Sequence, residues 1–221
     1  MVLVKLARSQ GKFIALEGGE GTGKSTQGGL LAEALREKHG VDVLVTREPG
    51  GTAGAEVIRS LLLDPPGEGW NARSEALLFA AARADHVARL IRPALDAGTW
   101  VISDRFVDSS RAYQGGAGGL GDESITALHG FGSDGFRPDC SLLLEVDNDT
   151  RSERLSARDG DLSDAIGGRG VAYHSEVARS FQALALGDPD GFAVINGNGT
   201  PAEVHERIIA AIAPLLEGLS R

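Results

Sequence analysis

Gly18-Gly19-Glu20-Gly21-Thr22-Gly23-Lys24-Ser25 is the segment with the strongest structural signal in this chain. It matches the spacing G-x-x-x-x-G-K-[ST] at every fixed position, and it lies between an apolar run, Phe13–Glu17, and a helical pattern, Lys24–Lys38. Glycines let the backbone amides of such a loop turn inward around a phosphate, and the following helix N-terminus adds partial positive charge. The segment therefore predicts a phosphate-binding loop, whereas a glycine-rich turn that matched by chance would lack these neighbours.

The polar residues of this loop indicate how a nucleoside triphosphate would bind. Lys24 can reach the β- and γ-phosphates, and the Ser25 hydroxyl can bind Mg²⁺ beside them. Asp104 follows the apolar run Trp100-Val101-Ile102, where such enzymes place a carboxylate near the metal; a plain strand-end cap is the alternative. The predicted metal ligands are Ser25 and Asp104, and the residues predicted to bind ATP are Gly18, Gly19, Glu20, Gly21, Thr22, Gly23, Lys24, Ser25 and Thr26.

Short apolar strands alternate with longer helical patterns along the chain, which predicts an α/β fold with about five parallel strands and helices on both faces. The expected strands are Phe13–Glu17, Val41–Thr46, Trp100–Ser103, Leu142–Val146 and Phe192–Ile195. The expected helices are Lys24–Lys38, Arg73–Ala97, Val171–Leu186 and Ala202–Leu216, with a kink or an early end at Pro93. Ligands of such sheets bind at the carboxyl ends of the strands, where this sequence gathers basic and polar residues.

Composition limits the partners and the compartment. Lys and Arg number 22 against 31 Asp and Glu, a formal net charge of -9, which argues against nucleic acid or an anionic membrane as the main partner. The length predicts one domain over residues 13–221 after a short extension, residues 1–12. A single cysteine, Cys140, excludes an internal disulfide and fits a reducing compartment, and we expect neither a signal peptide nor a membrane helix.

Two further patterns predict no site of their own. The segment Gly116–Gly121 spells G-x-G-x-x-G but follows no expected strand, so we expect a flexible loop there and no dinucleotide site. The five histidines show neither H-E-x-x-H nor clustered spacing, so a histidine-bound metal is not expected.

From Phe13 to the C-terminal helix, the chain resembles the bacterial thymidylate kinase family. The motifs that carry the resemblance are Phe13-Ile14-Ala15-Leu16-Glu17-Gly18, Thr46-Arg47-Glu48-Pro49-Gly50-Gly51-Thr52, Leu78-Phe79-Ala80-Ala81-Ala82-Arg83, Asp104-Arg105-Phe106 and Ser109-Ser110-Arg111-Ala112-Tyr113-Gln114. The resemblance implies a P-loop nucleoside monophosphate kinase fold with a mobile lid, which transfers a phosphate from ATP to dTMP to give dTDP for dTTP synthesis. It also implies a cytoplasmic homodimer that uses Mg²⁺.

Residue chemistry and the resemblance together indicate how dTMP would be held. Phe79 and Arg83 are four residues apart on an expected helix, so one face offers a ring and a guanidinium to the base; a core phenylalanine and a solvated arginine are the alternative. Arg47 and Arg105 stand at strand ends, and paired arginines suit an acceptor phosphate. The resemblance adds Glu20 near the 3′-hydroxyl, Pro49 in a tight turn for which a cis bond is one option, Tyr113 against a ribose 2′-hydroxyl, and substrate contacts from Ser109, Ser110 and Gln114, for which plain polar loop residues are the alternative.

The glycine- and aspartate-rich stretch Asp159–Gly170 predicts a mobile lid, which we take as residues 158–170. The bacterial pattern has an arginine directly after an aspartate in this lid, but here Asp164 is followed by Ala165. Because the phosphate loop contains no arginine, we expect the lid to supply a cation to the transferring phosphoryl group. The predicted catalytic residues are Lys24, Arg105, Arg158 and Arg169.

Other functions also use a phosphate loop. A kinase that acts on nucleosides would need a carboxylate to take a hydroxyl proton and would not need paired acceptor arginines, and another nucleoside monophosphate kinase stays open as an alternative. A regulatory GTPase would carry N-K-x-D, and this chain has no Asn-Lys pair. An inactive relative of a kinase is supported by Ala165 alone.

Overall fold

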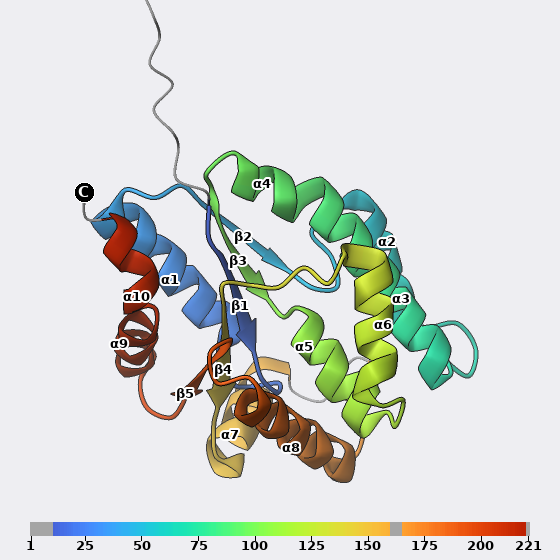
Figure 1. The fold of residues 1–221 in the computed structure, drawn as a ribbon. Coiled ribbons are helices and arrows are strands. Elements are labelled where there is room, and N and C mark those ends of the chain that lie inside the picture. The colour runs from blue at the N-terminus through green and yellow to red at the C-terminus, as the bar shows by residue number, and fades with distance from the viewer. Residues whose placement is uncertain (1–10, 160–164, 220–221) are drawn as a thin grey trace, which may run out of the picture.

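A parallel sheet runs through the centre of the computed structural model, which describes residues 11–159 and 165–219 (Figure 1). The strands lie in the order β2-β3-β1-β4-β5, so the strand that leads into the phosphate loop is central. The sheet confirms the predicted α/β fold, and the strand ends differ from the sequence-based bounds by one or two residues. The strands are β1 Phe13–Glu17, β2 Val43–Arg47, β3 Trp100–Asp104, β4 Cys140–Glu145 and β5 Phe192–Asn196.

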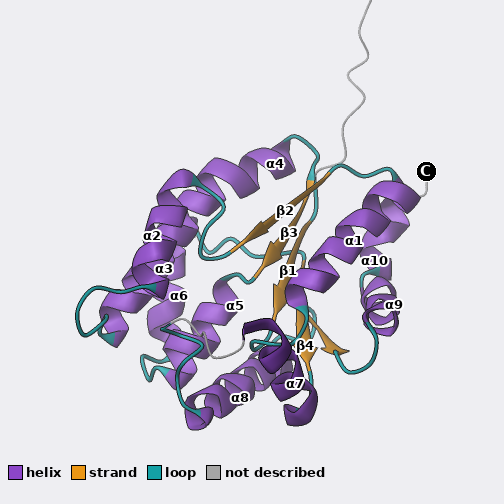
Figure 2. Ribbon diagram, turned by 180° about the vertical axis from the view of Figure 1, so that it is seen from behind, coloured by secondary structure: helices purple, strands orange, loops and turns teal. Residues whose placement is uncertain are grey.

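Helices cover both faces of this sheet (Figures 1 and 2). Helices α1, α9 and α10 lie on one side, and the opposite side carries α3 to α6. The α-helices are α1 Lys24–His39, α2 Ala53–Leu63, α3 Ala72–His86, α4 Arg92–Asp96, α5 Val107–Ser110, α6 Asp122–Ser133, α7 Asn148–Asp159, α8 Val171–Gly187, α9 Pro201–Ala211 and α10 Ala213–Leu216. Two π-helical segments, Val87–Ile91 and Arg111–Ala117, and a 3-10 turn, Glu217–Leu219, complete the helical parts.

Successive residues of β1 pack into different apolar clusters because neighbouring side chains of a strand point to opposite faces of the sheet. Ile14 packs with Leu31 of α1 and Ile208 of α9. Phe13 belongs to the cluster that contains Ile91, on the other face. The first four side chains of β1 are fully buried on both faces, which explains why they form a continuous apolar run in the sequence rather than an alternating one.

The predicted helix Arg73–Ala97 is helical as far as Asp96 but is not a single α-helix. Regular α3 ends at His86, the π-helical turn Val87–Ile91 follows, and α4 carries Pro93 in its first turn. Proline has no amide hydrogen to donate to the preceding turn, so the regular hydrogen-bond pattern cannot continue through it. The interruption predicted at Pro93 is therefore present, and it begins on the N-terminal side of the proline.

Two other predictions need correction. The flexible loop expected at Gly116–Gly121 is wrong for its first two residues, because Gly116 and Ala117 close the π-helical segment. A Cβ at Gly116 would lie 2.0 Å from Oγ of Ser180, so this glycine permits close packing on α8. The predicted helix Ala202–Leu216 is divided at Ile212 into α9 and α10.

The predicted N-terminal extension falls mostly on residues 1–10, which lie outside the described residues. Its last two residues are attached to the fold: the amide of Gly11 donates to the Leu95 carbonyl at 3.1 Å, and Lys12 pairs with Asp139 at 2.9 Å. Within residues 11–159 and 165–219, no helix is both long and apolar enough to cross a bilayer.

Candidate active site

A cleft of about 790 Å³ opens at the carboxyl ends of the strands, where the sequence predicts a ligand. We name its two ends for reference. The donor half is the end at the phosphate loop, and the acceptor half is the end formed by the residues after β2 and β3 and by α3. The predicted site residues that line it are Glu20, Gly21, Thr22, Gly23, Lys24, Ser25, Thr26, Arg47, Pro49, Phe79, Arg83, Asp104, Arg105, Ser109, Ser110, Tyr113 and Gln114. Gly18 and Gly19 are not part of the lining.

The turn from β1 into the phosphate loop requires glycine. Gly18 has a φ of +132°, and a Cβ there would lie only 2.5 Å from the carbonyl oxygen of Leu144 on the neighbouring strand. Gly23 caps the N-terminus of α1 with a φ of 93°, a left-handed conformation that side chains disfavour. These two positions explain why the motif fixes glycine at its first and sixth residues.

The side chain of Lys24 is held by the carbonyls of its own loop. Its Nζ donates to Gly18 O at 3.1 Å and to Gly19 O at 2.6 Å, and the residue is 7% exposed. Burial, and after it the charge of Arg105, lower the pKa of Lys24 to about 7. An anionic ligand in the cleft would favour the charged form of this lysine, because opposite charges stabilise each other in a partly buried site.

The two predicted metal ligands lie side by side. Oγ of Ser25, at the start of α1, donates to Oδ2 of Asp104, at the end of β3, at 2.6 Å. A hydroxyl and a carboxylate at one point of the cleft are oxygen ligands of the kind that Mg²⁺ prefers. The pairing of β1 with β3, in which Leu16 lies opposite Asp104, brings the carboxylate to the loop.

Arg105 directly follows β3 in a left-handed backbone conformation, with a φ of 72°. Hydrogen bonds on either side hold this peptide: its amide donates to Leu16 O at 2.9 Å, and its carbonyl accepts from Ser103 Oγ at 2.7 Å. The next amide, of Phe106, donates to Oε1 of Glu17 at 2.9 Å. Non-glycine residues in this region are uncommon and gather at functional sites.

The guanidinium of Arg105 is fixed at the junction of the two halves. It donates to Gly18 O at 3.0 Å, to Ser109 Oγ at 3.1 Å and to Tyr113 Oη at 3.2 Å. Ser109 in turn donates to Glu17 at 2.6 Å, so a buried carboxyl group positions the arginine through one hydroxyl. Burial, and after it the Asp108 charge, raise the pKa of Glu17 to about 8.

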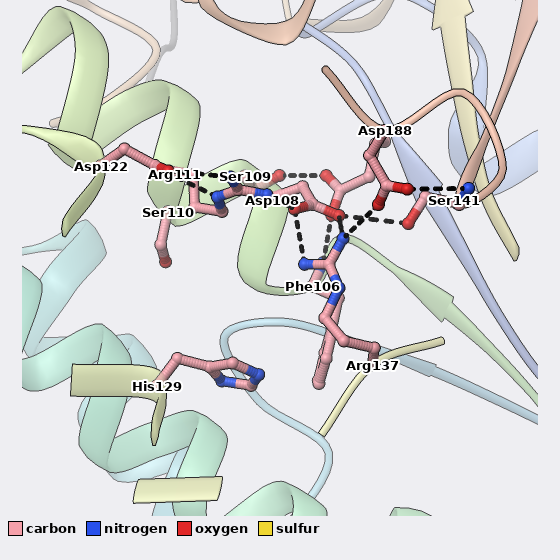
Figure 3. A network of polar contacts seen from close by, with 12 residues as sticks. Phe106, Asp108, Ser109, Ser110, Arg111, Asp122, His129, Arg137, Ser141 and Asp188 are labelled. Carbon is pink, nitrogen blue, oxygen red and sulfur yellow. Dashed lines mark hydrogen bonds and ion pairs between the residues drawn. The ribbon is translucent and has the colours of Figure 1, made fainter. Parts of the chain in front are cut away.

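A buried charge cluster anchors α5, the short helix that presents Ser109 and Ser110 (Figure 3). Asp108 is fully buried and accepts hydrogen bonds from Arg137 at 2.7 and 3.0 Å, from Arg111 at 3.0 Å and from Ser141 at 3.1 Å. Loss of one of these donors would leave a buried charge without its full set of partners.

Arg83 lies on the acceptor side and is 3% exposed. Its Nε donates to Glu48 at 2.7 Å, and its Nη2 donates to Ser110 Oγ at 2.8 Å and to Phe106 O at 3.3 Å. Glu48 also contacts the ring of His86 at 3.1 Å. The alternative of a solvated arginine is therefore wrong: the charge is buried and oriented, and it lines the cleft beside the half-buried Phe79.

Arg47 and Pro49 stand at the mouth of the acceptor half. Arg47 is exposed and pairs with Glu56 of α2 at 3.0 Å, and the Glu48–Pro49 peptide bond is cis. Arg59 of α2 donates to Pro49 O at 2.8 Å and also lines the cleft. Sequence reasoning missed Arg59 because it predicted no helix over Ala53–Leu63, although Thr52 has the side chain of an N-cap.

The lid arginines occupy different places. Arg158 lies in the last turn of α7, but its side chain is outside the described part of the structure, as are residues 160–164. Arg169 forms an ion pair with Glu75 and donates to Tyr173 Oη at 2.6 Å. Arg154, also on α7, donates to Gly197 O at 3.0 Å and contacts the phosphate loop at Thr22 O.

Several buried carboxylates of this site were missed by sequence reasoning. The only sequence signal for Glu17 is a charged residue at the end of a buried apolar strand. For the others, the partner lies far along the chain or on an unpredicted helix, so local patterns hold no information about it. The missed carboxylates are Glu17, Glu48, Glu75 and Asp108.

The parallel sheet, the phosphate loop after its central strand and the arginine-rich half opposite define a P-loop nucleoside monophosphate kinase fold. Residues 16–208 match the sequence model of the thymidylate kinase family. The chain belongs to this family, as its motifs predicted. A thymidylate kinase of Rhizorhabdus wittichii is 56% identical over 206 residues, which are 93% of this chain and 99% of that protein.

Two other thymidylate kinases are also similar to this chain. A thymidylate kinase of Halorhodospira halophila is 45% identical over 94% of this chain and 96% of its own length. A crystal structure of thymidylate kinase from Ehrlichia chaffeensis superposes with a TM-score of 0.73 at 33% identity, covering 92% of this chain and 99% of that one.

Proposed function

We propose that this chain transfers the γ-phosphate of ATP to dTMP in the cleft, giving ADP and dTDP for dTTP synthesis. The observation that carries the proposal is one cleft lined by residues 20–26 of the phosphate loop and, across from them, by acceptor residues of which Arg83, Ser110 and Gln114 are buried. The family membership supports the same reaction. Because the acceptor is a phosphate oxygen, already anionic at neutral pH, the reaction needs positioning and charge stabilisation rather than a strong general base.

The donor half would hold the triphosphate of ATP on residues 18–26. Lys24 would exchange its contacts with the Gly18 and Gly19 carbonyls for contacts with the β- and γ-phosphates. Ser25 and Asp104 would hold Mg²⁺, because both are oxygen ligands and their side chains meet at one point of the cleft. When bound, the metal supplies positive charge that neutralises the phosphate oxygens.

The acceptor half would hold dTMP with its base toward α3. Phe79 would stack on thymine while Arg83 donates to a carbonyl oxygen of the base. Arg105, fixed between Gly18 and Ser109, would bind the phosphate of dTMP, with Arg47 at the mouth of the cleft. The remaining proposed substrate contacts come from Glu20, Pro49, Ser109, Ser110, Tyr113 and Gln114.

Lys24 and Arg105 would stabilise charge on the moving phosphoryl group together with an arginine of the lid. The candidates are Arg158, at the end of α7, and Arg169, which would first have to leave Glu75. A Cβ built at Gly167 would lie 2.9 Å from a carboxylate oxygen of Glu20, so the C-terminal part of the lid already lies against the phosphate loop. Closure of the lid would exclude water and limit ATP hydrolysis.

We also propose a cytoplasmic homodimer. Helices α2, α3 and α6 pack side by side and expose large apolar side chains, among them Phe131, which is 94% exposed. Apolar residues gathered on neighbouring helices are typical of a surface that binds another protein, and a second copy of the chain is always available. The other large apolar residues exposed on these helices are Val57, Leu61 and Leu77.

An acceptor panel tests the proposed reaction. Coupled measurement of ADP release should show the highest kcat/KM with dTMP, poor use of UMP and dCMP, and no use of thymidine. The physical reason is that Arg83 can only donate hydrogen bonds. It suits a carbonyl oxygen of thymine but faces a second donor when cytosine presents its amino group. Equal specificity constants for dTMP and dCMP, or efficient use of thymidine, would contradict the proposal.

A further inference from the structure

The amide of Gln114 has a fixed orientation. Gln114 lies in the π-helical segment Arg111–Ala117 and is 2% exposed. It lines the cleft together with Phe79 and Arg83. Its Nε2 donates to Oε1 of Glu75 at 2.8 Å. A carboxylate can only accept hydrogen bonds, so Glu75 selects the nitrogen of the amide and leaves the oxygen, Oε1, for a ligand in the cleft.

Glu75 is itself held from the far end of the lid. It is 6% exposed, and its Oε2 pairs with Nη2 of Arg169. Arg169 also donates to Tyr173 Oη at 2.6 Å, and that hydroxyl donates to Tyr113 O at 2.9 Å. A chain of hydrogen bonds therefore runs from the lid to the Gln114 amide and fixes the carboxylate in the rotamer that contacts it.

Glu75, Phe79 and Arg83 follow one another at intervals of four residues on α3, so they lie on one face of the helix. That face places an orienting carboxylate, a ring and a guanidinium in a row along the acceptor half. Arg83 is a pure donor, and the oriented Gln114 offers an acceptor. A donor next to an acceptor is the complement of a base edge that carries a carbonyl oxygen beside an N–H group.

We propose that Glu75 is a positioning residue that sets the base specificity by fixing the Gln114 amide, and that Arg169 holds Glu75 for this purpose. The inference rests on the proposed function, because it requires dTMP in the acceptor half. Thymine offers O4 to Arg83 and N3–H to Gln114 Oε1. Cytosine has an amino group in place of O4 and an unprotonated N3. It would therefore set a donor against Arg83 and an acceptor against Gln114 Oε1.

Glu75→Gln tests this directly because an amide at position 75 can donate to Gln114 Oε1. The Gln114 amide can then turn and offer its NH₂ group to the base, which suits N3 of cytosine. We expect the ratio of kcat/KM for dTMP to that for dCMP to fall by about tenfold or more, in the range of one mispaired hydrogen bond. The ratio for dTMP to dUMP should stay within about twofold, because uracil and thymine share the same hydrogen-bonding edge.

Variants of Arg169 and a control at Glu123 complete the test. Arg169→Ala should lower the dTMP to dCMP ratio in the same direction, and Arg169→Lys should recover part of it, because a lysine can still pair with Glu75. Glu123→Gln changes an exposed carboxylate of α6 and should leave every ratio unchanged.

The outcomes separate the inference from the function on which it rests. An unchanged dTMP to dCMP ratio in Glu75→Gln would overturn the positioning role while dTMP kinase activity persists. If the ratios for dCMP and dUMP shifted together, Glu75 would only support the pocket wall, which also overturns the inference. A wild-type chain without preference for dTMP over dCMP would instead refute the proposed function.

Discussion

Replacing Glu17 with Gln is expected to change how the free energy of unfolding depends on pH. In the fold, burial and then the Asp108 charge raise the pKa of Glu17 from 4.5 to about 8. Between these values the folded chain binds one proton more than the unfolded chain, so this group makes stability fall as pH rises. Glutamine at position 17 is uncharged at every pH and keeps an oxygen that can accept from the Phe106 amide.

The size of the effect follows from one proton. A difference of one bound proton changes the free energy of unfolding by about 1.4 kcal/mol per pH unit. Lys24 acts in the opposite direction, but only above its lowered pKa of about 7, where the unfolded chain binds the additional proton. Between about pH 5.5 and 6.5, the difference in stability between variant and wild type should therefore change by about 1 kcal/mol in favour of the variant.

Urea unfolding of both proteins at these two pH values measures the difference. Glu123→Gln serves as the control, since it makes the same change at an exposed position of α6 and leaves Glu17 in place. Parallel pH dependences of the Glu17→Gln variant and the wild type would refute a proton on Glu17. A variant that lost stability faster than the wild type as pH rises would contradict the sign.

Arg105→Ala should weaken dTMP binding and lower kcat by about a hundredfold, while ATP binding changes little, because two of the guanidinium's hydrogen bonds go to Ser109 and Tyr113 on the acceptor side. Titration calorimetry with each nucleotide checks this, and lost ATP affinity with intact dTMP affinity would reverse the assignment. Arg158→Ala should lower kcat more than dTMP affinity in steady-state kinetics, and full kcat in both this variant and Arg169→Ala would exclude a lid cation. Phe131→Asp should give a monomer in sedimentation velocity, because a charge would be buried in the interface, and an unchanged dimer would remove α6 from it.

Strands, the phosphate loop and the strand-end residues could be predicted because their signals are local. The buried strand β1 is apolar from Phe13 to Leu16, and the loop after it needs glycine wherever its backbone is left-handed or crowded by β4. The positions of Arg47, Asp104 and Arg105 followed from the rule that parallel strands end at one edge. The structure places all three in the cleft.

The parts that could not be predicted depend on contacts between distant segments. Arg111–Ala117 contains two glycines and favours a loop by propensity, yet packing on α8 makes it helical. Likewise, no local pattern pairs Glu75 with Gln114, or Glu17 with Ser109, because these pairs form only when α3, β1 and the segment after β3 come together. Such buried pairs orient the side chains that the sequence did identify.

Transfer of labelled phosphate measures the central claim most directly. The full-length chain is incubated with dTMP and with ATP labelled in the γ-phosphate, and the products are separated by chromatography. We predict that the label appears in dTDP, and that Lys24→Ala, while it stays folded, forms labelled dTDP about a hundredfold more slowly or worse. Label found only in inorganic phosphate, or wild-type formation of labelled dTDP by Lys24→Ala, would contradict transfer from ATP to dTMP on this phosphate loop.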